Sequence, residues 1–188
     1  MEVILGVGMV VLTTRDLAFV SVSAAIWAVL NITIVPVFWE ATRLPILCDL
    51  IGVALFAVTA WWVRKPGAVA LMGGVATVLN FIMRPGAFQF LGFTVAAIVY
   101  DIVISLIGYD RCFRQRTEPV MIVGLSIGSA FVAGAVIGSL FMPPVAVNSY
   151  GGVLLFAGLH AAGGGAGGLL GLALVRGLSK RGLGGMDS

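Results

Sequence analysis

Residues 68–83 read AVALMGGVATVLNFIM, a run of sixteen residues without a single charge. Arg64-Lys65-Pro66-Gly67 stands before the run, and Arg84-Pro85-Gly86 follows it. A cation, a proline that stops a helix and a glycine that allows a turn therefore bound one apolar helix on both sides. At ~1.5 Å per residue this helix would measure about 24 Å, less than the ~30 Å hydrocarbon core of a bilayer. We expect it to span a membrane only if the flanking turns also dip below the headgroups.

The composition of the whole chain indicates a membrane protein. Apolar residues make up 60% of the 188 residues, charged residues 10%, and the mean hydropathy is +1.12. A water-soluble domain of this size could not keep so much apolar material off its surface. The net charge of +3 does not indicate nucleic-acid binding, because the cations form short clusters between apolar runs. Cys48 and Cys112 lack metal-site spacing and lie at opposite ends of predicted spans, so we expect neither a disulfide nor a zinc site.

The apolar runs divide the chain into six expected membrane spans within one domain, residues 1–188. Turn residues such as Pro36 and Pro143-Pro144 separate them, and residues 1–14 are too short an apolar stretch to count as a span. We therefore expect an all-α bundle of six transmembrane helices, followed by a mobile, basic cytoplasmic tail over residues 176–188. The expected spans are 17–37, 46–63, 68–83, 88–109, 119–142 and 151–175.

The cations predict the orientation of these spans. Short loops rich in Lys and Arg stay in the cytoplasm. If the first residue is cytoplasmic, only Arg43 and Arg84 of the eleven cations fall outside. We therefore expect a multi-pass cell-membrane protein with both termini in the cytoplasm. The inner cations are then Arg15, Arg64, Lys65, Arg111, Arg114, Arg116, Arg176, Lys180 and Arg181.

The segment from Arg64 to Arg111 resembles a known family. It combines a basic-Pro-Gly-Ala turn, a short apolar helix, a Gly-bearing turn and a further helix that ends in Tyr109-Asp110-Arg111. This pattern, with six spans in under 200 residues, is similar to the substrate-binding S component of energy-coupling factor (ECF) vitamin transporters, closest to the hydroxymethylpyrimidine/thiamine type. The resemblance implies an ECF-type S-component fold and ATP-driven uptake of a small water-soluble vitamin or precursor. It also implies three partners, a coupling (T) subunit and two ABC ATPase subunits.

The resemblance also assigns a partner-docking face to the first span. In S components, small residues four apart on this span pack against the T subunit. Here Ala24 and Ala28 have that spacing and overlap with Ser21 and Ala25. Small side chains let helix backbones approach closely in lipid, where van der Waals packing drives association.

Polar residues inside apolar spans are costly, which makes them candidate ligand-binding residues. Asp101 and His160 are predicted at comparable depth in spans four and six, so they would either bind a ligand together or form a structural pair with each other. Arg84, spaced i,i+4 from Asn80, would line the same vestibule or extend to the headgroups. Glu40 would contribute to the site or pair with Arg43. The remaining candidates are Trp39 and Tyr150, which could instead be interfacial aromatics, and Asn148.

Two other readings of the sequence remain open. Ser126 lies in a G-x-S-x-G pattern, and the segment that starts at His160 resembles the histidine helix of rhomboid intramembrane proteases, so a serine–histidine dyad is conceivable. A self-powered small-solute carrier is the second alternative. The sequence has no G-x-x-x-x-G-K-[ST] loop, so we expect no ATPase activity of its own, no enzyme activity, no metal and no cofactor. The glycines at 124, 128, 134, 138, 163–165, 167, 168 and 171 are expected to be helix-packing faces.

Overall fold

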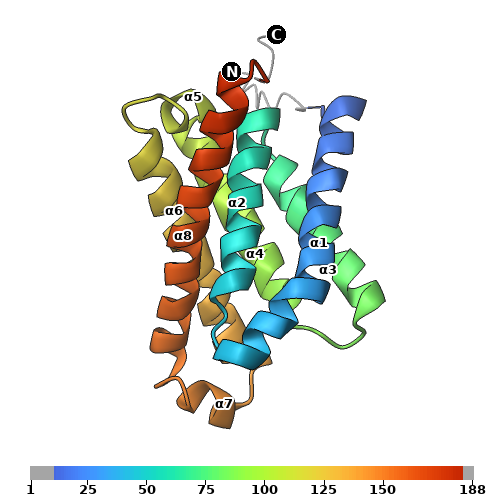
Figure 1. The fold of residues 1–188 in the computed structure, drawn as a ribbon, viewed down its shortest axis with the longest axis vertical. Coiled ribbons are helices and arrows are strands. Elements are labelled where there is room, and N and C mark those ends of the chain that lie inside the picture. The colour runs from blue at the N-terminus through green and yellow to red at the C-terminus, as the bar shows by residue number, and fades with distance from the viewer. Residues whose placement is uncertain (1–10, 184–188) are drawn as a thin grey trace, which may run out of the picture.

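The computed structural model describes residues 11–183, which form helices joined by short turns, without a strand in that range. The predicted all-α class is confirmed for this part of the chain, which Figure 1 shows as a bundle of upright helices. The helices are α1 (Thr14–Thr42), α2 (Ile46–Val63), α3 (Ala68–Met83), α4 (Phe90–Ile107), α5 (Tyr109–Cys112), α6 (Glu118–Val136), the π-helical turn η1 (Ile137–Phe141), α7 (Pro144–Asn148) and α8 (Val153–Lys180).

Five segments within the described residues are long and apolar enough to cross a bilayer: α1, α2, α4, α6 continued by η1, and α8. A multi-pass membrane protein is therefore supported, as predicted. The central apolar run forms α3 between the predicted residues, but with 16 residues it is shorter than these five. Its crossing of the membrane, and so the count of six spans, stays a prediction.

Helix α1 is longer at both ends than the predicted span 17–37. It begins with a capping box in which the Thr13 side chain accepts from the Asp16 backbone N–H and the Asp16 carboxylate accepts from that of Thr13. It continues through Pro36 and ends at Arg43, which adopts a left-handed conformation with φ of 58°. Figure 1 shows the last turns of α1 swinging beneath α2, and Pro36 is the residue there that removes a helical hydrogen bond. This turn places the end of α1 near the start of α2.

The short helix α3 packs against α1 and α4 and depends on α4 for its start. Asp101 of α4 accepts hydrogen bonds from the backbone N–H of Gly67 at 2.6 Å and of Val69 at 3.0 Å. These are amides of the first turn of α3, which lack partners inside the helix. Gly67 has a φ of 90° that favours glycine, so no capping side chain precedes α3 and the carboxylate from α4 takes that role.

Helix α8 is held between α2 and α6 by glycines on two of its faces. A Cβ at Gly163, Gly167 or Gly171 would meet α2, at distances such as 2.7 Å from the Leu50 carbonyl oxygen for Gly167. A Cβ at Gly164 or Gly168 would meet Ser126 of α6 instead. Glycine therefore lets backbones touch on both sides of one helix, as predicted for these positions.

Other glycines depart from the predicted packing faces. A Cβ at Gly124 or Gly128 of α6 would meet nothing within 4 Å, so this G-x-x-x-G pair does not face a helix of the described bundle. The difference arises because α8 packs on the other side of α6, against Ser126 and Ala130.

Helix α8 extends beyond the predicted span 151–175, because residues Arg176 to Lys180 of the predicted tail complete the helix. The Arg176 Nε donates to the buried Glu118 carboxylate of α6 at 3.1 Å, which fixes the end of the helix. Residues 184–188 of the predicted tail, and residues 1–10 of the segment not counted as a span, lie outside the described residues.

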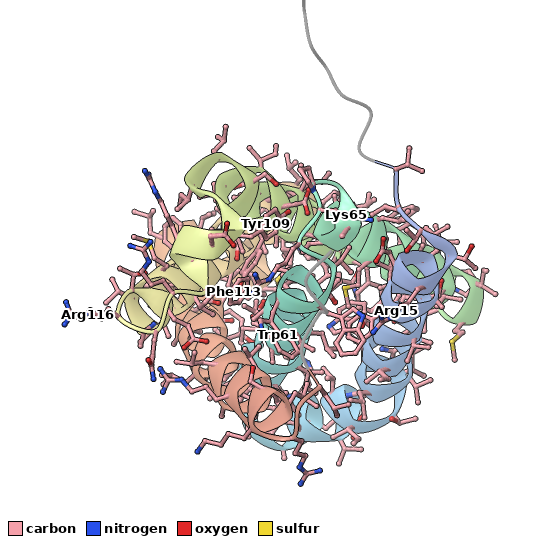
Figure 2. The ribbon with its side chains drawn as sticks, turned by 90° about the horizontal axis from the view of Figure 1, so that it is seen from above. Arg15, Trp61, Lys65, Tyr109, Phe113 and Arg116 are labelled. Atoms are coloured by element: carbon pink, nitrogen blue, oxygen red, sulfur yellow. The ribbon has the colours of Figure 1, made fainter. Side chains whose placement is uncertain are left out.

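Cations gather at the end of the bundle where α1 begins and α8 ends. Figure 2 looks onto this end and shows Arg15, Lys65 and Arg116 around it. Lys65 pairs with Asp16 at 2.8 Å, and Arg64 pairs with Asp110 at 3.4 Å. Arg43 and Arg84, at the ends of α1 and α3, lie at the opposite end of the bundle. The structure therefore separates the cations as the predicted topology requires, while the cytoplasmic assignment stays a prediction.

Candidate functional site

A cavity of about 410 Å³ lies at the end of the bundle opposite the basic one. Its volume falls in the range typical of pockets for small molecules. Residues from α1, α2, α4, α6, η1, α8 and the turns beside them line it: Asn31, Val35, Pro36, Trp39, Glu40, Pro45, Cys48, Asp49, Arg84, Gln89, Phe90, Phe93, Ala133, Ile137, Phe141, Met142, Phe156 and His160.

Two ionisable side chains of this lining, Asp49 and His160, are buried and lie in contact with each other. The Asp49 Oδ2 lies 2.7 Å from the His160 Nδ1, and the two side chains are only 8% and 5% exposed. Asp49 is in the first turn of α2, and His160 is in the third turn of α8. The close approach depends on Gly163, where a Cβ would lie 3.0 Å from that of Asp49. The glycine face of α8 therefore brings the carboxylate to the imidazole.

This pair corrects the predicted association of Asp101 with His160. The Asp101 carboxylate accepts hydrogen bonds from the start of α3, toward the basic end, and Asp101 does not line the cavity. His160 instead takes Asp49 as its partner. The available signal was a carboxylate inside the predicted span 46–63, which is as costly in a membrane as one in span four.

Aromatic side chains form part of the cavity walls. Trp39, Phe90, Phe93, Phe141 and Phe156 all contribute to the lining. The Phe93 ring stacks on Trp27 with centroids 3.7 Å apart, and Phe156 presents its edge to the His160 ring at 4.7 Å. These contacts hold the rings in place before any ligand enters. The cavity therefore offers flat apolar surfaces around one buried carboxylate–imidazole pair.

The remaining polar groups of the lining differ in exposure. Glu40 and Arg84 line the cavity and are exposed, whereas Asn31 is buried and donates from Nδ2 to the Cys48 sulfur at 3.2 Å. The predicted Glu40–Arg43 pair is not among the ion pairs within 4.0 Å in residues 11–183. Arg43 is used differently, since its carbonyl oxygen accepts a hydrogen bond from the Tyr150 hydroxyl at 2.6 Å.

Of the eight predicted ligand-binding residues, the structure brings four to the cavity: Trp39, Glu40, Arg84 and His160. The other four, Asp101, Asn80, Tyr150 and Asn148, do not line it. The Asn80 side chain turns back to donate to the Ala76 carbonyl oxygen at 2.8 Å, and Asn148 is exposed at the end of α7. The Tyr150 ring packs against the rings of Trp39 and Phe156, so it contacts two residues of the lining without lining the cavity itself.

The serine–histidine dyad is not assembled in this structure. The Ser126 hydroxyl donates to the Ile122 carbonyl oxygen of its own helix at 2.6 Å and faces Gly168 of α8. His160 is engaged with Asp49, and Phe156 covers the ring. Ser126 therefore serves helix packing here.

The predicted docking face on α1 is divided between two environments. Ala24 and Ala28 are 0% and 1% exposed, within the core that α1 forms with its neighbours. Ser21 and Ala25 are exposed and lie beside the exposed Val22 and Ile26. The assignment of Ala24 and Ala28 to an external partner is therefore wrong for this conformation, because both already pack inside the chain.

No protein-family model, no curated protein and no solved structure matches this chain.

Proposed function

We propose that this protein is the substrate-capture subunit of an ECF-type importer, binding a small water-soluble vitamin or precursor, with hydroxymethylpyrimidine or thiamine-like compounds as the first candidates. The observation that carries the proposal is the cavity of about 410 Å³, placed at the bundle end away from the cation clusters. If the basic end is cytoplasmic, the cavity opens on the outer side, where an importer must meet its solute.

The lining suits recognition of a small organic molecule. Aromatic walls supply apolar contact area, and a few polar groups give the ligand an orientation. The Asp49–His160 pair is the buried ionisable part of this lining, so we assign it the main polar contact. Asp49 takes the ligand-binding role that the sequence suggested for Asp101.

The coupling partner is proposed to dock on the exposed part of α1. Ser21 and Ala25 present small side chains there, flanked by Val22 and Ile26, and a helix of a T subunit could approach closely on this face. Two ATPase subunits would complete the importer, and this chain would act without a cofactor of its own. This face replaces the buried Ala24 and Ala28.

The experiment combines ligand identification with partner capture. Mass spectrometry of small molecules that copurify with the protein should find a vitamin-like compound, which Asp49→Asn should reduce by about tenfold or more, as expected for a lost charge-assisted contact. Leucines at Ser21 and Ala25 should abolish copurification with a coupling module while ligand binding persists. Leucine at Gly128, which adds the same kind of bulk on an open face of α6, is the matched control. Full complex formation with both leucines on α1 would refute the docking face.

A self-powered carrier is the second candidate, and the buried Asp49–His160 pair favours it. Ionisable pairs inside membrane helices often mark proton pathways. The two functions differ in their need for partners. Uptake by the purified chain alone in liposomes, driven by a pH gradient, would select the carrier and exclude the capture subunit.

A further inference from the structure

The charge state of the cavity depends on one buried carboxylate and one imidazole. Among the ionisable groups that line it, Glu40 and Arg84 are exposed, whereas Asp49 and His160 are almost fully buried. A buried carboxylate without a positive partner is strongly unfavourable in a medium of low dielectric constant. An ionised Asp49 is therefore stabilised by a positive charge beside it, and without one the buried carboxyl group would itself take up a proton.

The groups around the pair identify the source of that charge. On α2 the neighbour is the Cys48 thiol, and on α1 it is the Asn31 amide that donates to this thiol. On α6, Gly134 packs on the His160 ring, and on α8 the edge of Phe156 does so. Arg84 forms no ion pair with Asp49 within 4.0 Å. In the described residues, His160 is thus the basic group in contact with Asp49, and a proton on its ring makes the pair neutral overall.

His160 Nδ1 lies at ion-pair distance from Asp49, but neither ring nitrogen makes a hydrogen bond of good geometry within the described residues. Nε2 is buried, and no hydrogen bond from the described residues satisfies it. With the ring doubly protonated, its Nε2–H lacks an acceptor; with the ring neutral and Nδ1–H donated to Asp49, the Nε2 lone pair lacks a donor. A ligand N–H beside this nitrogen supplies the missing donor, and it can do so only after Nε2 has given up its proton.

We propose that Asp49 and His160 form a proton-exchange site, in which a cationic N–H group of the ligand replaces the proton carried by His160 in the empty cavity. The proton leaves Nε2 for solvent through the cavity mouth, and the ligand cation then donates to Nε2 and balances Asp49. One positive charge enters for each that leaves, so the buried site stays neutral. The aromatic walls hold the apolar body of the ligand. This inference rests on the proposed function only in taking the cavity as the solute site.

The chain contains one histidine, which makes the exchange directly observable. Protein labelled with ¹⁵N-histidine and reconstituted in lipid nanodiscs gives NMR signals from His160 alone, and these report its protonation state and tautomer. The probes are benzamidine, a planar aromatic cation with N–H donors, and benzamide and benzoate, which have nearly the same shape but are neutral and anionic. All three are small enough for a cavity of about 410 Å³.

Benzamidine should bind at least about tenfold more tightly than benzamide or benzoate, the scale of a charge-assisted contact. Its affinity should rise by up to about tenfold per pH unit where the empty site is protonated, and then level off. The ¹⁵N signals should change from a doubly protonated to a neutral ring on binding, and calorimetry in buffers of different ionisation enthalpy should detect about one proton released.

Matched variants separate the two members of the pair. His160→Gln should retain benzamidine binding but lose its pH dependence and the proton release. Asp49→Asn should lose the preference for benzamidine over benzamide. Asp110→Asn, which removes an exposed carboxylate at the basic end and outside the cavity lining, should keep both properties and serves as the control.

Three results would overturn the proposal: equal binding of benzamidine and benzamide, no benzamidine binding at millimolar concentration, or an imidazole whose protonation state is the same with and without bound benzamidine. In each case the capture of a vitamin-like solute and the pull-down of the coupling module would still be measured independently. Failure of the exchange is therefore distinguishable from failure of the proposed function.

Discussion

The glycine face of α8 makes a sharp test of the fold, because one helix offers both a tight and an open site. Gly167 faces α2, where an added Cβ would lie 2.7 Å from the Leu50 carbonyl oxygen and 3.0 Å from that of Asp49. Both neighbours are backbone atoms and cannot rotate away. Gly158 lies in the same helix, and an added Cβ there would meet nothing within 4 Å.

The two alanine variants should change stability in opposite directions. Alanine is favoured over glycine in a helix by about 0.8–1 kcal/mol, so Gly158→Ala should stabilise by up to this amount. Gly167→Ala receives the same gain but must separate α2 from α8, and overpacking costs typically ~1–3 kcal/mol. The net expectation is therefore a loss of up to about 2 kcal/mol, with the difference between the variants between about 1 and 3 kcal/mol.

The assay is thermal unfolding of both variants and the wild type in the same detergent. For a chain of this size, ~1 kcal/mol corresponds to a shift of roughly 2–4 °C in Tm, so the variants should differ by several degrees. Because Gly167 holds the turn of α2 that carries Asp49, the Gly167 variant should also bind ligand less tightly. A Gly167→Ala protein as stable as Gly158→Ala would show that α2 and α8 are not in backbone contact and would refute the packing argument.

Three further predictions follow from individual contacts. Asp101→Asn should destabilise the protein by about 0.5–2 kcal/mol in thermal unfolding, because it weakens the cap of α3. Ligand affinity should stay unchanged, and a loss of affinity in the folded variant would show that Asp101 contributes to ligand binding after all. Cys112 is 0% exposed and burial raises the pKa of its thiol, so an impermeant maleimide should label it only after denaturation. With Cys48 and Cys112 replaced by serine, a cysteine at Arg116 should react only from the cytoplasmic side and one at Arg84 only from outside, and the reverse pattern would invert the topology.

Much of the helical layout follows from the sequence because local chemistry sets it. The predicted boundaries of 46–63 and 68–83 coincide with α2 and α3, since Pro66-Gly67 and Pro85-Gly86 combine a residue that interrupts a helix with one that allows a turn. Boundaries were less accurate where tertiary packing supports the chain beyond such signals. The end of α1 runs past Pro36 to Thr42, and α8 continues to Lys180 with the support of Glu118.

The sequence by itself determined that this is an all-α membrane protein with its cations separated toward two ends, because hydropathy and charge act along the chain without reference to contacts. Only the tertiary structure decided which buried carboxylate serves which purpose. Asp49 and Asp101 both lie in apolar helices, and no local pattern distinguishes them. Asp101 meets the free amides of a neighbouring helix start, and Asp49 meets an imidazole across a glycine contact. A buried charge needs a partner group. Which group becomes that partner depends on which helix backbones pack closely enough to bring it into contact.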